Sequence, residues 1–102
     1  MYVSDYEKIG FGSGDWLYQL YNSGSDTTFS FNIIADSIVY GHTYTMTDMF
    51  FGFSRMYIGD SYVEYSAASF THTRNEATQR ENITAAVTLA TGQSYVVIYD
   101  AE

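Results

Sequence analysis

The chain has 102 residues, which is enough for one domain with a single core, and we expect residues 1–102 to form that domain. Its net charge of −8, with only four Lys and Arg side chains, excludes the basic surface that nucleic-acid binding requires and disfavours adsorption to an anionic membrane. The absence of cysteine excludes disulfides and thiol chemistry.

Aromatic residues make up 19% of the chain and include eleven tyrosines, a composition that favours β-strands. Residues 1–20 contain no basic segment followed by an apolar run, so we predict no signal peptide. No apolar run is long enough to cross a bilayer as a helix. The sequence therefore leaves the compartment unknown, with the cytoplasm as the default expectation.

The first predicted strands flank a turn at residues 22–26. Residues 16–21 are apolar on both faces, which predicts a central strand covered on both sides. Residues 28–33 alternate with period two and place Phe29 and Phe31 on one face. A glycine-rich loop at residues 10–15 precedes this hairpin.

The middle of the chain contains shorter signals. Residues 42–47 alternate, with Tyr44 and Met46 on one face, and predict another strand. The apolar cluster at residues 49–53 is expected to be buried. Further short strands are expected at residues 55–58, 62–65 and 67–73, the last at a sheet edge.

The last third begins with a polar stretch at residues 75–81, which we interpret as an exposed loop rather than a helical turn capped by Asn75, because it has no apolar stripe. Residues 83–89 alternate and residues 95–99 are apolar on both faces, so two more strands follow. About seven or eight short strands predict an all-β antiparallel β-sandwich, immunoglobulin-like or jelly-roll-like in architecture, or a small barrel.

Candidate catalytic and metal-binding residues are few. His42 and His72 lie in threonine-rich stretches and are expected to be exposed strand residues, with no nucleophile elbow and no closely spaced second zinc ligand. Asp15 and Asp60 follow glycines and are expected to be turn residues rather than calcium ligands. The sequence therefore predicts no enzyme, no metal site and no cofactor.

The excess of tyrosine points instead to contacts. Charged residues are only 16% of the chain, and interface cores are poor in charge and rich in aromatics. We therefore predict a non-enzymatic protein-binding or self-assembly module, whose partner is another protein or a second copy of the chain. The expected contact residues are Trp16, Tyr18, Tyr21, Tyr62 and Tyr65.

Two alternatives remain open. The acidic charge is typical of a small inhibitor that covers a basic protein, as immunity proteins and nucleic-acid mimics do. A carbohydrate- or calcium-binding sandwich would need a groove containing Trp16 or an exposed tyrosine, or aspartates that converge from separate loops.

Overall fold

A computed structural model describes residues 1–12 and 14–100 of the chain, and over these residues it contains eight strands and no α-helix. Two single-turn 3₁₀ helices, η1 (Met46–Asp48) and η2 (Phe51–Phe53), follow the fourth strand. The strands in chain order are β1 (Asp5–Gly10), β2 (Asp15–Asn22), β3 (Thr27–Ile34), β4 (Thr43–Thr45), β5 (Arg55–Ile58), β6 (Ser61–Asn75), β7 (Arg80–Leu89) and β8 (Ser94–Asp100).

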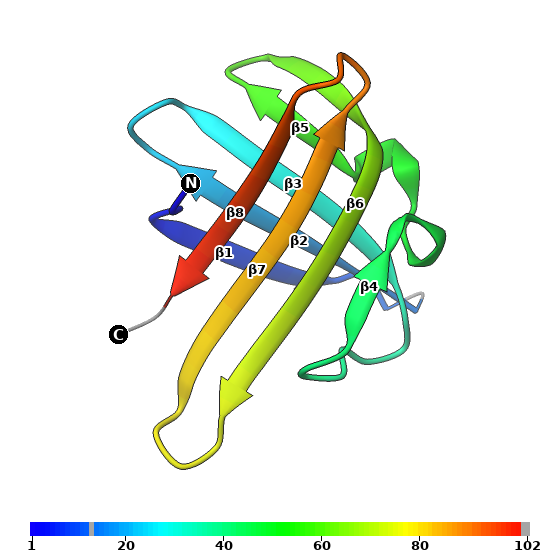
Figure 1. Cartoon of the computed structure of the whole chain (residues 1–102). Coiled ribbons are helices and arrows are strands. Elements are labelled where there is room, and N and C mark those ends of the chain that lie inside the picture. The colour runs from blue at the N-terminus through cyan, green and yellow to red at the C-terminus, as the bar shows by residue number, and fades with distance from the viewer. Residues whose placement is uncertain (13, 101–102) are drawn as a thin grey trace.

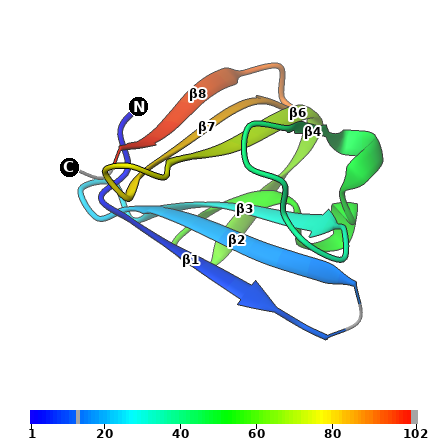
Figure 2. The same cartoon turned by 90° about the horizontal axis from the view of Figure 1, so that it is seen from below.

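The strands form one antiparallel sheet in the order β1-β2-β3-β5-β6-β7-β8, with β4 paired to β6. The sheet curls into a half-barrel, so that β1, β2 and β3 face β6, β7 and β8 (Figures 1 and 2). β6 has 15 residues and belongs to both walls, because it pairs first with β5 and then with β4 and β7. The predicted all-β class is therefore confirmed.

A sandwich of two separate sheets, immunoglobulin-like or jelly-roll-like, is not confirmed. Residues 62–65 and 67–73 were predicted as separate strands, but both lie in β6. The register of β6 against β7 shifts between Tyr65 and Ala67, which is a β-bulge. A bulge bends a strand and increases its twist, so the chain passes from one wall to the other without leaving the sheet.

The N-terminal residues join the two ends of the strand order. Tyr2 forms a parallel bridge to Ile98 of β8. The Val3 N–H donates to the Ile98 carbonyl at 2.8 Å, and the Ile98 N–H donates to the Met1 carbonyl at 2.9 Å. β1, which follows directly, was not predicted from the sequence, because its charged residues hide any apolar alternation.

The core fills the space between the two walls. The predicted alternation in residues 83–89 is confirmed, because every second residue of this part of β7 is buried. In β3, Phe29, Phe31 and Ile33 are buried on the inner face as predicted, but Ser30 and Asn32 on the opposite face are buried as well. Phe31 of β3 spans the interior, with its ring centroid 5.4 Å from that of Tyr65 and 5.3 Å from that of Phe70. The largest fully buried apolar side chains are Tyr18, Leu20, Phe29, Phe31, Ile33, Phe70, Ile83, Leu89 and Val97.

Two predicted central strands are not covered on both faces. β8 lies at an end of the strand order, and Val96 on its outer face is 53% exposed. Tyr21, at the outer face of β2, is 37% exposed. An apolar run has no periodicity that tells a covered strand from one with an exposed aromatic face, so this prediction was wrong.

The predictions for the segments around β4 and after β6 were confirmed only in part. Only Thr43–Thr45 of the predicted strand at residues 42–47 is extended, and η1 follows it. The polar stretch expected as an exposed loop at residues 75–81 is an exposed turn only at residues 76–79, because Asn75 ends β6 and Arg80 begins β7. The Asn75 side chain accepts the N–H groups of Ala77 and Thr78, and this Asx turn leads directly into β7.

The apolar cluster at residues 49–53 is only partly buried, against expectation. Met49 is buried, whereas Phe50 and Phe53 are 45% and 53% exposed. The segment lies on the outer face of β3, where the Ser30 hydroxyl donates to the Phe53 carbonyl at 2.6 Å. It thereby buries the polar side chains of Ser30 and Asn32, which the alternation placed on an open face.

Candidate functional site

Three tyrosines occupy one cross-strand row on the outer face of the sheet. Tyr21 of β2 pairs with Thr28, Thr28 pairs with Tyr57 of β5, and Tyr57 pairs with Tyr62 of β6. Tyr21 is 37% exposed, Tyr57 half-buried and Tyr62 52% exposed. The rings of Tyr57 and Tyr62 lie 6.0 Å apart. We call these three side chains the tyrosine row.

Acidic side chains surround the tyrosine row. The Tyr21 hydroxyl donates to Asp26 Oδ1 at 3.2 Å, and this hydrogen bond raises the pKa of Tyr21. Beside Tyr21 lies a hollow of about 240 Å³ lined by Asp5, Tyr6, Glu7, Gln19, Tyr21 and Thr28. Asp5 and Glu7 belong to β1, next to β2, whereas Asp26 and Asp60 lie in the turns that follow β2 and β5, and Glu64 lies on β6.

One cation belongs to this face. The Arg55 guanidinium lies 4.2 Å from the centroid of the Tyr62 ring, within cation–π range. Arg55 is also the register partner of Glu64 on β6. The face therefore already accommodates one guanidinium against an aromatic ring.

The other end of the same face is apolar. A hollow of about 320 Å³ is lined by Asp15, Asn32, Ile34, Phe50 and Phe53. Ile34 is 56% exposed, and the rings of Phe50 and Phe53 lie 5.7 Å apart. The outer face thus changes from tyrosine and carboxylate at one end of β3 to exposed apolar side chains at the other.

The predicted contact residues do not form one group. Tyr18 and Tyr65 are 0% and 6% exposed, so neither can contact a partner from the surface, and those two assignments need correction. Their rings pack in the core because they occupy inward positions of β2 and β6. Trp16 is half-buried on the inner side, with Lys8 Nζ 4.6 Å from its ring centroid and its indole N–H donating to the Asp36 carbonyl at 3.3 Å.

Tyr21 and Tyr62 lie together in the tyrosine row, although 41 positions separate residues 21 and 62 in the chain. Tyr57 and the carboxylates near the row were not among the contact residues predicted from the sequence. The alternation within each strand indicates which residues share a face, but only the pairing register places residues of different strands in one row.

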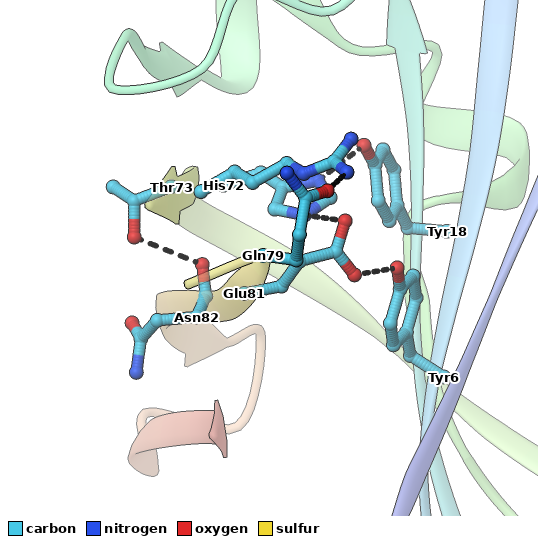
Figure 3. A network of polar contacts seen from close by, with 8 residues as sticks. Tyr6, Tyr18, His72, Thr73, Gln79, Glu81 and Asn82 are labelled. Carbon is cyan, nitrogen blue, oxygen red and sulfur yellow. Dashed lines mark hydrogen bonds and ion pairs between the residues drawn. The ribbon is translucent and has the colours of Figure 1, made fainter. Parts of the chain in front are cut away.

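A buried polar network links four strands inside the curled sheet (Figure 3). Tyr18 Oη of β2 lies 2.8 Å from His72 Nδ1 of β6, and His72 Nε2 lies 3.5 Å from Glu81 Oε1 of β7. The Tyr6 hydroxyl of β1 donates to Glu81 Oε2 at 2.6 Å. Because the carboxylate faces Nε2, we assign the neutral tautomer with its proton on Nε2, so that Tyr18 donates to Nδ1.

The environment keeps both phenols protonated and the imidazole neutral. Burial raises the pKa of Tyr18, and burial together with the hydrogen bond to Glu81 raises the pKa of Tyr6. Burial lowers the pKa of His72 below its usual value of 6.5, although the Glu81 carboxylate opposes this shift. Neutral His72 is therefore the dominant form near neutral pH.

We predict that His72 makes the free energy of unfolding depend on pH. The charged groups that act on it are Glu81 of β7, Lys8 of β1 and Arg74 of β6. Since its pKa is lower in the folded than in the unfolded chain, its contribution is fully present above pH 6.5 and is lost as the pH falls below that value. The slope is at most about 1.4 kcal/mol per pH unit, measurable by urea unfolding between about pH 7.5 and 5.5.

The matched variants for this prediction are His72→Gln and His42→Gln. His42 is exposed and lies outside the polar network, so it serves as the control, whereas His72→Gln should remove the part of the slope that begins below pH 6.5. An unchanged slope in His72→Gln would show that other groups cause the pH dependence.

The expectation that both histidines are exposed was wrong for His72, which is 1% exposed. In residues 67–73 both faces carry polar or small side chains, so the sequence pattern does not show which face points into the core. A side chain so deeply buried cannot reach a substrate in this conformation, and the network therefore connects the two walls rather than forming an open catalytic site.

Over residues 1–12 and 14–100, no group of three or more His, Cys, Asp or Glu side chains is arranged to hold a metal ion. The same residues include no helix of sufficient length and hydrophobicity to span a bilayer. No family model, no curated protein and no solved structure matches the chain significantly. Inference about function therefore depends on the chemistry of the surfaces described above.

Proposed function

We propose that the protein is a non-enzymatic binding module that contacts a protein partner through the outer face of β1, β2, β3, β5 and β6. The observation that carries this proposal is the tyrosine row, in which three aromatic side chains from different strands share one exposed face. Tyrosines offer large contact area at low entropic cost and are enriched at protein interfaces.

Self-assembly by edge pairing has less support. β1 carries Asp5, Glu7 and Lys8, and charged side chains on an edge strand oppose pairing with a second sheet. β4 is only 3 residues long, and residues 1–3 lie along β8. A second copy of the chain would have to bind through the outer face itself. A molar-mass measurement by light scattering distinguishes such a dimer from a monomer that binds another protein.

A small acidic inhibitor of a basic protein is the second candidate function. The carboxylates around the tyrosine row favour it, because complementary charge accelerates association with a cationic surface. The two functions share one surface and differ in whether binding blocks the activity of the partner.

We expect Tyr62→Leu to weaken binding at least about tenfold, which corresponds to about 1.4 kcal/mol. The test selects peptides from a random display library on the wild-type protein and measures their dissociation constants for wild type and variant. Tyr2→Leu is the matched control, because Tyr2 is 70% exposed but lies outside the tyrosine row. The Tyr2→Leu variant should bind the selected peptides with the same affinity as the wild type.

Peptides that bind Tyr62→Leu as well as they bind the wild type would refute this surface assignment. Failure to enrich any peptide, combined with binding to a glycan panel, would favour the carbohydrate-binding alternative instead.

A further inference from the structure

We propose that the tyrosine row recognises arginine side chains in an extended basic segment of the partner. This inference rests on the proposed function and names the chemistry of the partner. It starts from Arg55, whose guanidinium lies 4.2 Å from the Tyr62 ring centroid and whose register partner is Glu64. The chain thus contains an internal example of the guanidinium–tyrosine part of the contact that we assign to the partner.

The hollow beside Tyr21 presents the same chemistry to solvent. It combines the exposed Tyr21 ring with Asp5 and Glu7, and Gln19 adds a further polar group. Within the described residues, neither carboxylate forms an ion pair with Lys or Arg. Asp5 Oδ1 accepts the Tyr6 N–H at 2.8 Å, which leaves its second oxygen and the Glu7 carboxylate for an incoming cation.

The geometry of the face favours arginine over lysine. A guanidinium is planar, stacks on an aromatic ring and donates two parallel hydrogen bonds to a carboxylate, whereas an ammonium group is a strongly hydrated point charge. The hollow of about 240 Å³ places ring and carboxylates within reach of one side chain. Tyr57 and Tyr62 extend the aromatic surface across β5 and β6.

Charge complementarity selects the class of partner. The net charge of −8 repels nucleic acids and other polyanions and attracts cationic segments. An extended segment laid along the row crosses strands that are about 4.8 Å apart. Tyr21 and Tyr57 are separated by β3, so about 9.6 Å lies between them, whereas alternate residues of an extended segment are about 6.7 Å apart. The long side chains of two arginines spaced by two residues span the remaining distance of about 3 Å, so that one arginine reaches Tyr21 and the other reaches Tyr57.

The test compares three synthetic peptides that alternate threonine with arginine, lysine or citrulline, by calorimetry at physiological salt. We expect the arginine peptide to bind at least about fivefold more tightly than the lysine peptide, and the neutral citrulline peptide not to bind detectably. Tyr21→Leu should remove the preference for arginine. Equal affinity for the arginine and lysine peptides would overturn the inference.

Two charge-matched variants separate a specific contact from general attraction. Glu7→Gln alters the hollow, whereas Glu76→Gln alters the exposed turn between β6 and β7, and each raises the net charge by one unit. We expect the affinity for the arginine peptide to fall at least about threefold only in Glu7→Gln. An equal fall in both variants would show non-specific electrostatics and would overturn the inference.

Failure of this inference is distinguishable from failure of the proposed function. Library-selected peptides that depend on Tyr62 but contain no arginine would overturn the arginine assignment and leave the binding surface intact. Selected peptides that ignore both Tyr21 and Tyr62 would overturn both.

Discussion

Phe31→Ala is expected to lower the free energy of unfolding by about 3–5 kcal/mol. Phe31 is fully buried, and its ring packs against the rings of Tyr65 and Phe70 of β6. Truncation removes apolar area from the contact between the two walls of the curled sheet and leaves a cavity that rigid strands cannot close. Urea unfolding at constant temperature measures the loss as a lower midpoint with an unchanged slope.

Phe53→Ala is the matched control, because it is the same substitution at a side chain that is 53% exposed. Its cost should stay below about 1 kcal/mol. Domains of this kind have a total stability of about 5–15 kcal/mol, so Phe31→Ala approaches global unfolding and Phe53→Ala does not. Similar losses in the two variants would contradict the core assignment.

Tyr18→Phe is expected to lower the free energy of unfolding by about 1–3 kcal/mol, although it removes only one oxygen atom. The Tyr18 hydroxyl is the partner of His72 Nδ1 at 2.8 Å, and His72 is 1% exposed. Without the hydroxyl, a buried acceptor loses its hydrogen bond and water has no access to replace it. The same denaturation experiment measures this cost.

Two control variants test whether this loss of stability comes from the hydrogen bond between Tyr18 and His72. Tyr2→Phe removes a hydroxyl from a side chain that is 70% exposed and should change stability by less than about 0.5 kcal/mol. The double variant Tyr18→Phe/His72→Leu should cost less than the sum of its single variants, because it removes the hydrogen bond from both sides. Strict additivity would show that Tyr18 and His72 do not interact in the folded protein.

Much of the fold was predictable because strand residues face alternate sides with a period of two. The alternation in β3 and β7 correctly identified Phe29, Phe31, Ile83 and Val87 as inward-facing. The exposed loop after β6 was also predicted from its lack of an apolar stripe, although it covers only residues 76–79, where the Asn75 side chain accepts two local hydrogen bonds. These features depend on residues within one strand or turn.

The candidate site was predictable only in part. Tyr21 and Tyr62 were expected to be contact residues because tyrosine is abundant, and the same reasoning selected the buried Tyr18 and Tyr65. An aromatic side chain suits both a core and an interface, so residue type alone cannot separate them.

The amino-acid sequence by itself determined the all-β class, the acidic charge and the inward residues of the alternating strands. Only the tertiary structure decided that β6 continues through a bulge, which joins both walls in one curled sheet. It also placed Tyr21, Tyr57 and Tyr62 in one row and joined Tyr18, His72 and Glu81. The physical reason is that pairing register and sheet curvature result from contacts between strands that are distant in the chain, which no local pattern encodes.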